Sequence, residues 1–456
     1  MHTEPGGLWL RETQGNQPST PGVFRFNVPR QLRHLALVLA SAGACTAASA
    51  VLPQGGPLQC VFEGTGAEAA SPQRDPVLGR FWIREIDSDE IAWVDPVTLR
   101  RTREDRAALP EQTGLWAVSP HGLWVSTGLR RGIRIIDTKR LTSVATIQTD
   151  RGPSALAWLS DDLLATVTSG KATLWDARGH QIESFELAPG DRVTTWHSGA
   201  GRLIALVAPD VRGGHGAARL LEISGAGMEV VALDRVAAGY DPEMGEHGTL
   251  LTPGLAYDPV GQRAFVVPPD GPIAEVDLDG LTVTYHSTET YPVEAVATAL
   301  VPAASAKLSG SATREAVWLG EGLIAVSGFD NRTFRPDGQP AGVTIIDTRD
   351  WSICLLDRRP TRIALTGGTL LAWGGGDFGE QGGVGLMGYA LADGRRWHLF
   401  GRQYIDVHVY DGYAYAINSW DGWHVSTVDV SSGRILVERE GRPPTVLSTR
   451  SSLQGW

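Results

Sequence analysis

A unit of about 40 residues recurs along most of this 456-residue chain, and it limits the possible folds more than any other feature. Each unit has four short apolar stretches separated by tight turns, and the third stretch usually ends in an acidic residue. The clearest copies are residues 114–147 and 153–187. The third stretches end at Asp95, Asp137, Asp176, Ser224, Asp277, Asp347, Ala390 and Asp429. After Pro53, no segment has the periodicity of a three-turn amphipathic helix.

Repeats of this length with four strands are typical of β-propeller blades. One twisted four-stranded sheet with two apolar faces cannot bury both, so such sheets pack face to face around an axis. The sequence therefore predicts an all-β fold, a β-propeller of four-stranded antiparallel blades. We count eight blades, and seven is the alternative because the units ending at Ser224 and Ala390 are degenerate. We expect each repeated Asp to be structural, its carboxylate accepting a hydrogen bond from the backbone N–H two residues on.

The two ends of the repeat region predict how the ring closes. The first unit has candidate strands near residues 80–86, 90–94 and 99–103 and lacks an innermost strand. The tail segment Pro443–Arg450 resembles the first strand of a unit without its blade. We expect this C-terminal strand to complete the first blade and leave no open sheet edge. The predicted domains are an N-terminal extension with signal peptide (1–52), a linker (53–79), the propeller (80–450) and a tail (451–456).

The N-terminal region predicts export. A basic segment, residues 30–34, precedes the apolar run Leu35–Ala50, which ends in Ala-Ser-Ala. This order is typical of a secretory signal peptide, with a buried apolar helix as the alternative. Gly, Ser, Thr and Cys interrupt the run, so we expect no transmembrane span after processing. Residues 42–45 also resemble a lipoprotein cleavage box, which makes a lipid anchor at Cys45 a second possibility. The predicted location is periplasmic, cell-surface or extracellular.

The net charge and the number of cysteines exclude two classes of protein. The net charge of −11 argues against a nucleic-acid partner, because such proteins neutralise phosphates with an excess of Lys and Arg. Three cysteines cannot form a disulfide framework. Export permits a bridge between Cys60 and Cys354, but we favour two independent buried cysteines.

Two sets of repeats carry a family resemblance. Residues 132–162 and 343–365, each with the sequence IIDT before a further strand and a proline, resemble the repeat of secreted YVTN-type propellers. Residues 390–397 and 428–438 are similar to the quinoprotein-like (PQQ-like) repeat, in which an Ala-Asp…Gly…Trp segment docks neighbouring blades. The resemblance implies a secreted or cell-surface binding or scaffold protein. The chain lacks the adjacent Cys-Cys pair that quinone-cofactor dehydrogenases of this shape often carry, so no quinone cofactor is predicted.

The longest predicted connections fall where a propeller opens on one face. Residues 209–217, 328–342 and 374–384 join second to third strands, and residues 235–251 and 287–312 join units. Long loops are often functional, so we expect this long-loop face to bind a ligand. The candidate ligand-binding residues are Asp210, His215, Asp241, His247, Asp330, Arg332, Asp337, Asp377, Glu380 and, in the turn 418–424, Trp420.

These candidates have two interpretations. The carboxylates and imidazoles suit a divalent metal, the Asp and Arg residues suit a polar or sugar-like ligand, and Trp420 can stack on a sugar. The alternative is that they are ordinary turn residues. Trp158, Trp175 and Trp318 lie in apolar stretches, where we expect them to pack between blades.

The sequence contains no nucleophile elbow, zinc triad or paired-carboxylate motif. We therefore predict a non-catalytic exported protein that recognises a protein, glycan or cell-envelope partner through its long-loop face. No cofactor is predicted, and a bound divalent metal is the alternative. The competing function is a propeller enzyme, such as a lyase, a lactone hydrolase or a metal-dependent oxidoreductase, with its site in the central funnel.

Overall fold

The structure is a computed structural model, and the parts of the chain that it describes lie between Phe81 and Leu447. The described ranges are 81–84, 90–94, 107–108, 112–140, 142–168, 170–209, 216–240, 250–287, 312–330, 339–374, 384–399, 404–410, 412–418, 424–440 and 445–447. The chain divides into two units, Met1–Gly55 and Gly56–Trp456, and every described residue belongs to the second. All regular elements within the described ranges are strands. None of these ranges contains a helix long and apolar enough to cross a membrane.

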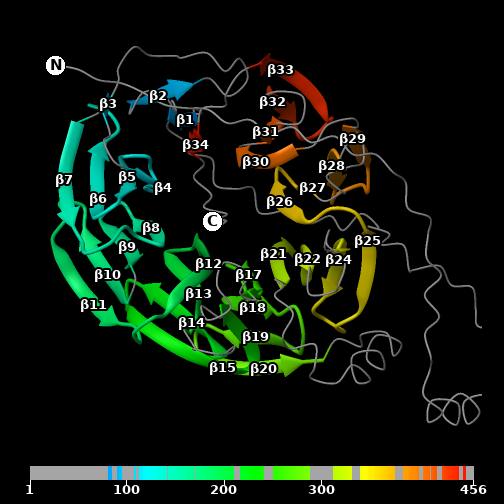
Figure 1. The fold of residues 1–456 in the computed structure, drawn as a ribbon, viewed down its shortest axis with the longest axis horizontal. Coiled ribbons are helices and arrows are strands. Elements are labelled where there is room, and N and C mark those ends of the chain that lie inside the picture. Colours follow the sequence, from blue (N-terminus) through cyan, green and yellow to red (C-terminus); the bar gives the residue numbers. More distant parts are fainter. Residues whose placement is uncertain are drawn as a thin grey trace, which may run out of the picture. The chain divides into compact units, whose positions relative to one another are not determined.

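Six sheets of the described part have four antiparallel strands each. Five of them are formed by consecutive strands: β4 (Gln112–Val118), β5 (Trp124–Leu129), β6 (Gly132–Asp137) and β7 (Thr142–Gln148); β8 (Ala155–Ser160), β9 (Leu163–Thr168), β10 (Lys171–Asp176) and β11 (Gln181–Glu186); β17 (Gly254–Asp258), β18 (Arg263–Val267), β19 (Ile273–Asp277) and β20 (Thr282–His286); β26 (Arg362–Thr366), β27 (Thr369–Trp373), β28 (Leu386–Ala390) and β29 (Arg396–Leu399); β30 (Tyr404–Tyr410), β31 (Tyr413–Asn418), β32 (His424–Asp429) and β33 (Arg434–Glu440). These five sheets are arranged around a common axis, with the first strand of each nearest to it (Figure 1). The predicted all-β propeller of four-stranded antiparallel blades is confirmed.

A seventh sheet has ten strands and joins two such arrays. It contains β12 (Arg192–Gly199), β13 (Arg202–Ala208), β14 (Gly216–Ser224), β15 (Gly227–Tyr240), β16 (Leu250–Thr252), β21 (Ala312–Gly320), β22 (Leu323–Asp330), β23 (Gln339–Pro340), β24 (Val343–Asp347) and β25 (Ile353–Asp357). The short strand β16 makes the connection, because it pairs antiparallel with the end of β15 and parallel with the start of β21.

The sixth four-stranded sheet contains strands from both ends of the described chain. Its order is β3 (Ala107–Ala108), β2 (Glu90–Val94), β1 (Phe81–Arg84) and β34 (Thr445–Leu447). Strand β34 lies in the predicted tail segment and pairs antiparallel with β1, Ile83 opposite Val446. The third predicted strand, near 99–103, falls outside the described residues, and the sheet is continued by β3 instead.

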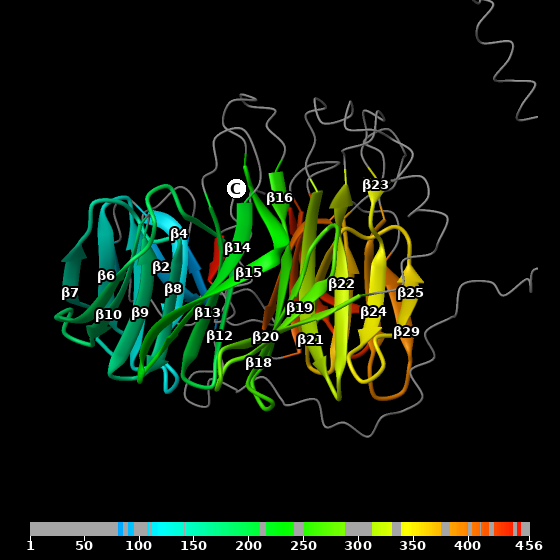
Figure 2. The same ribbon diagram turned by 90° about the horizontal axis from the view of Figure 1, so that it is seen from below.

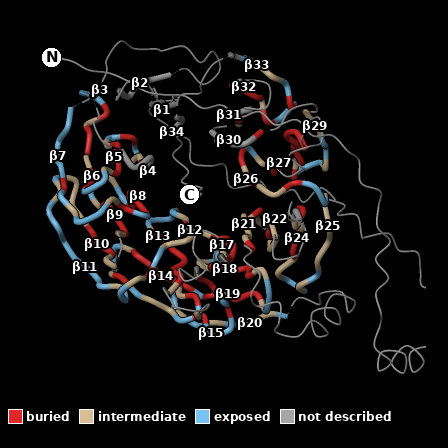
Figure 3. The backbone as a smooth tube through the Cα atoms, in the orientation of Figure 1, coloured by how far each residue is buried: buried red, intermediate tan, exposed pale blue. Residues whose placement is uncertain are grey.

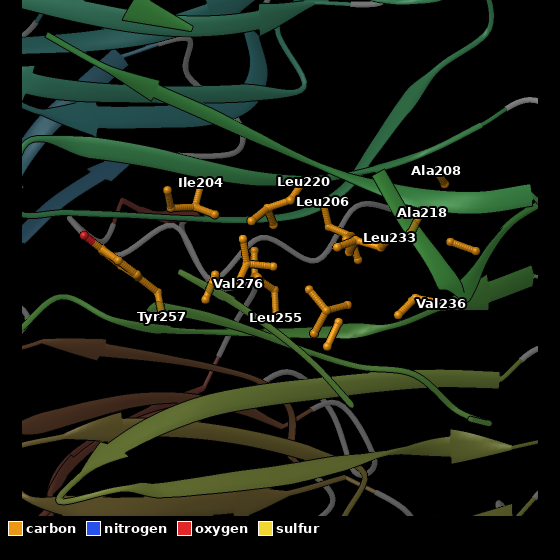
Figure 4. Close-up of a cluster of buried hydrophobic side chains, with 14 of the residues drawn as sticks. Ile204, Leu206, Ala208, Ala218, Leu220, Leu233, Val236, Leu255, Tyr257 and Val276 are labelled. Atoms are coloured by element: carbon orange, nitrogen blue, oxygen red, sulfur yellow. The ribbon is translucent and has the colours of Figure 1, made fainter. Parts of the chain in front are cut away.

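The core lies between neighbouring sheets. Figure 4 shows one cluster, in which Ile204, Leu206 and Leu220 of one sheet meet Leu255 and Val276 of the next. All five side chains are at most 1% exposed, and burying each contributes about 1.5–3 kcal/mol. The inner strands β8 and β17 are largely buried, whereas the outer strands β7 and β11 are mostly exposed (Figure 3). The sheets therefore hide their apolar faces by stacking on each other, as a propeller requires.

The repeated Asp has the predicted structural role. Its carboxylate oxygen accepts the backbone N–H two residues on, at 2.8 Å for Asp137 and 2.9 Å for Asp176, Asp277, Asp347 and Asp429. The two degenerate units use substitutes. The Ser224 hydroxyl accepts from Ala226 N at 3.2 Å, and Asp393 accepts from Arg395 N at 3.1 Å.

The docking contact implied by the quinoprotein-like resemblance is present between β29 and the next sheet. Trp397 Nε1 donates a hydrogen bond to the Val430 carbonyl at 2.8 Å. Its indole ring covers Gly433, where an added Cβ would lie 2.5 Å from the ring. Gly433 also has φ +69°, a conformation that glycine adopts at no steric cost.

One cysteine expectation is wrong. Cys354, on the outer strand β25, is disulfide-bonded and is not an independent buried thiol. The other two cysteines of the chain, Cys45 and Cys60, lie outside the described residues.

Candidate functional site

The strands place the predicted long loops on one face. Strand β13 ends at Ala208 and β14 begins at Gly216. Strand β22 ends at Asp330 and β24 begins at Val343. Strand β27 ends at Trp373 and β28 begins at Leu386. These are second and third strands of their arrays, so their connections share an edge with the connections between sheets. Figure 2 shows β16 and β23 together at that edge. We call this edge the long-loop face and the opposite edge the turn face.

The long-loop face carries extra strand structure near β21. Strand β15 has 14 residues, and its end pairs with β16 through Gly239 and Leu251. Leu251 then pairs with Ala312 at the start of β21. Strand β23 adds a further pair, Phe329 with Pro340. The sheet β17–β20 thus lies between two arrays that are joined at the long-loop face.

Of the predicted ligand-binding residues, Asp330 lies in the described chain. It is the last residue of β22, pairs with Ala312 and Gln339, and is partly exposed. The others lie outside the described residues, and their roles stay predictions: Asp210, His215, Asp241, His247, Arg332, Asp337, Asp377, Glu380 and Trp420.

The inner strands carry polar groups that the sequence analysis did not single out. Glu315 on β21 accepts a hydrogen bond from Ile363 N at 3.1 Å, and its carboxylate lies 3.6 Å from the Arg362 guanidinium on β26. His197 Nε2 on β12 lies 2.6 Å from the Leu255 carbonyl on β17, so this nitrogen carries the proton. Each contact joins the inner strands of neighbouring arrays.

The inner strands also approach each other closely at Gly254, the first residue of β17. A Cβ at this position would lie 2.9 Å from backbone atoms of Glu315 and Ala316 on β21. Real Cβ atoms essentially never come that close to backbone, so glycine is required here. These contacts hold the inner strands β12, β17, β21 and β26 against one another.

Arginine pairs with most of the buried carboxylates. Asp191, directly before β12, is 2% exposed and bonds to Arg219 on β14. Arg202 on β13 bonds to Glu222 on β14 and, at 2.9 Å, to Asp279 of the neighbouring sheet. Burial raises the pKa of Asp191 and of Glu222, and the facing guanidinium reduces this effect in each. Within the described ranges, no group of three or more His, Cys, Asp or Glu side chains could hold a metal ion.

The aromatic residues of the apolar strands pack between sheets, as predicted. Trp318 on β21 stacks on Phe265 of β18, with ring centroids 5.3 Å apart and an interplanar angle of 6°. Trp351 of the β24–β25 turn stacks on His286 of β20 at 3.6 Å. Arg263 and Glu275 complete this cluster, with Glu275 bonding both Arg263, at 3.0 Å, and His286, at 2.8 Å. Trp158 is 7% exposed and belongs to a separate apolar cluster of the sheets β4–β7 and β8–β11, against which Trp175 also packs.

Comparisons with known proteins support the fold. No family model matches the chain. No curated protein matches it either. Similar solved structures include dihydro-heme d1 dehydrogenase NirN in complex with DHE, with TM-score 0.52 and 14% identity over 80% of this chain and 74% of that chain. BamB from Moraxella catarrhalis has TM-score 0.45 and 13% identity over 76% and 95% of the two chains. Apo AztD from Citrobacter koseri has TM-score 0.47 and 12% identity over 80% and 96%. At such identities the likeness to NirN concerns the fold alone, and this chain has the fold of a β-propeller.

Proposed function

We propose that this chain is an exported, non-catalytic β-propeller, a binding or scaffold protein that recognises a protein or glycan partner of the cell envelope through its long-loop face. The observation that supports this most directly is the extra structure on one edge. Strands β16 and β23 both lie there, at the edge where β13, β15 and β22 end. A rigid array of sheets that presents long connections on one side is a common arrangement for recognition.

Three carboxylates of the described residues are engaged in contacts within the fold. Glu315 is held by Arg362 and a backbone N–H, and Asp191 and Glu222 are each held by an arginine. A guanidinium or a backbone N–H that bonds to a carboxylate fixes the position of that side chain. These residues therefore suit a structural role in positioning the loops.

Export is tested by sequencing the N-terminus of the protein recovered from its native host and by fractionating the cells. We expect a chain that begins after Ala50, or at Cys45 if it is lipid-anchored, and that is absent from the cytoplasmic fraction. A cytoplasmic protein that retains residues 1–50 would overturn this part of the proposal.

Binding is tested with two loop variants, in which residues 331–338 or 376–382 are replaced by Gly and Ser of equal number. We expect each to lose capture of an envelope component that the parent protein captures, with little change in melting temperature. The matched control, Lys139→Gln with Arg140→Gln, changes the turn face and keeps capture. Equal capture by all variants would contradict the proposal, and stoichiometric calcium, zinc or copper in the purified protein would favour the propeller enzyme instead.

We also infer an eight-bladed ring closed by the C-terminal strand. Six four-stranded sheets support this count, together with the β12–β15 and β21–β25 arms of the ten-stranded sheet. Ending the chain after residue 440 removes β34 and leaves β1 without that neighbour. We expect this truncation to lower the melting temperature, and an unchanged melting temperature would refute the closure.

A further inference from the structure

Strand β25, the outer strand of its array, carries a disulfide. Cys354 is disulfide-bonded, and β25 is the last of the described strands along its sheet, next to β24. The chain has three cysteines, so the partner within the chain is Cys45 or Cys60. Cys60 belongs to the same compact unit as β25, whereas Cys45 belongs to the other unit. This division favours Cys60 as the partner.

The composition of β25 differs from that of other outer strands. Residues 353–356 form an unbroken apolar run, Ile-Cys-Leu-Leu. The outer strands β7, β11 and β20 are interrupted instead by Thr, Ser, Gln or Glu. All five residues of β25 are half-buried, whereas all six residues of β11 are exposed. An apolar strand at the edge of a sheet invites pairing with a further strand unless something covers it.

The two faces of β25 are occupied by the neighbouring sheets. Cys354 and Leu356 pack on the apolar cluster shared with β26–β29, and Ile353 packs on the cluster shared with β17–β20. The outer edge is the side on which β25 has no partner among the described strands. A strand that pairs there would place a residue opposite Cys354 on the same face, with the two Cβ atoms about 4.5–5.5 Å apart. A disulfide needs about 3.5–4.5 Å, so the closer pairs of an added strand suit a bond at this position.

The segment around Cys60 has the sequence of a short strand. Residues 58–62, Leu-Gln-Cys-Val-Phe, are bounded by Gly-Gly-Pro before them and Glu-Gly after them, and Gly and Pro commonly bound strands. With Cys60 opposite Cys354, the strand period of two puts Leu58 and Phe62 on the face of Cys354. That face packs on the apolar cluster shared with β26–β29. The 20 residues between Cys60 and Phe81, where the described chain begins, can extend over about 70 Å, so the connection allows this placement.

We propose that residues 58–62 bind as an added strand along the outer edge of β25 and that a Cys60–Cys354 disulfide locks them there. The bond forms when the two thiols are oxidised by a disulfide-carrying oxidant, whose own disulfide takes up the two electrons and two protons and becomes two thiols. The inference rests on the proposed export only for this oxidising environment. The added strand covers the apolar edge that β25 would otherwise offer to another chain, and it attaches the N-terminal region to one sheet of the propeller.

Peptide mapping tests the covalent part of the proposal. The full chain is purified and oxidised with glutathione disulfide, so that the result does not depend on export. We expect a Cys60–Cys354 cross-linked peptide in digests made without reductant. Cys60→Ser should remove this cross-link, and the matched control Cys45→Ser should keep it.

Hydrogen exchange of the same oxidised protein tests the added strand. We expect slow amide exchange in residues 353–357 of β25. Gln59→Pro with Val61→Pro removes two backbone N–H donors and keeps the thiol between them. This variant should speed exchange in residues 353–357 about fivefold, the equivalent of one hydrogen bond of about 1 kcal/mol. Exchange in residues 181–186 of β11 should stay the same as in the parent.

Several results would overturn the proposal. A free Cys354 thiol or a cross-link to Cys45 would do so, and so would a disulfide-linked dimer, because a second copy would then be the occupant. Equal exchange of residues 353–357 in the parent and the proline variant would also overturn it, because the disulfide would then hold a segment that does not pair with β25. Melting temperatures verify that each variant is folded. Oxidation is carried out in vitro, so failure would leave the fractionation and capture results standing, and the reverse also holds.

Discussion

Substituting Gly433 by Ala should destabilise the protein through a single tryptophan in the neighbouring sheet. Two effects add at this position. An L-residue in the left-handed region, here φ +69°, costs about 1–2 kcal/mol. The new Cβ would also lie 2.5 Å from the Trp397 ring, which must move. Displacing the ring breaks its hydrogen bond to the Val430 carbonyl, about 0.5–1.5 kcal/mol. It also loses part of the packing of this partly buried side chain, which is worth less than the roughly 3–5 kcal/mol of a fully buried Trp.

Gly412 provides the matched control, because it has φ +80° and an added Cβ would meet nothing within 4 Å. Gly412→Ala should show the backbone cost alone, and Gly433→Ala should be at least about 2 kcal/mol worse, from the hydrogen bond and packing of one tryptophan. Urea denaturation followed by tryptophan fluorescence and circular dichroism measures both. In the Trp397→Ala background the two glycine substitutions should cost about the same. Equal destabilisation in the parent background, or an unchanged difference without Trp397, would refute the reasoning.

Three further predictions concern acid sensitivity, the disulfide and the turns. The hydrogen bond from the Arg349 side chain lowers the pKa of Asp347. Burial raises the pKa of Asp357, but the hydrogen bonds from Arg359 lower it by more than burial raises it. Both carboxyl groups therefore have a pKa below the normal value in the folded protein. The stability that these groups contribute is present above the unfolded pKa of about 3.9 and is lost as pH falls through the folded values, so thermal melts should show constant melting temperature from pH 5 to 7 and a fall below about pH 4. Peptide mapping without reductant should find Cys354 in a cross-linked peptide, most informatively with Cys60; a free Cys354 thiol would contradict the structure. Asp176→Ala should cost about 1 kcal/mol and Asp176→Asn about half of that, because Asn keeps the oxygen that accepts Arg178 N and His180 N; equal melting temperatures would argue against a capping role.

The features that the sequence predicts best are local ones. The Asp137 and Asp176 turns depend on a hydrogen bond between residues two apart, so the motif and its structure lie within one short segment. The docking of Trp397 on the next sheet was implied by the quinoprotein-like resemblance, whereas its contact with Gly433 was not predicted. Strand β16 could not be predicted, because three residues carry no periodicity and its partner Ala312 lies about 60 residues away. The disulfide of Cys354 likewise depends on tertiary proximity.

In the candidate site too, local features could be predicted from the sequence and tertiary contacts could not. Loop composition selected Asp330 and nine other residues, because Asp, Gly and Pro mark loops without specifying what they bind. The polar contacts of the inner wall were missed. A usable signal was present: the first stretch of one unit, ATREAVWLG, places Arg314 and Glu315 inside an otherwise apolar strand. A charged residue at such a position needs a partner, and Arg362 supplies it for Glu315.

Net charge is an incomplete guide to partners in a repeat protein of this kind. When most units carry an acid in the same turn, the acids accumulate at one edge, as Asp137, Asp176, Asp277, Asp347 and Asp429 do here. Most of that negative charge serves the backbone and would be present whatever the protein binds. The opposite edge is free of this requirement, and there Arg130 and Arg131 lie exposed in a two-residue turn. The charge of the long-loop face therefore has to be judged from its own residues and not from the net charge of the chain.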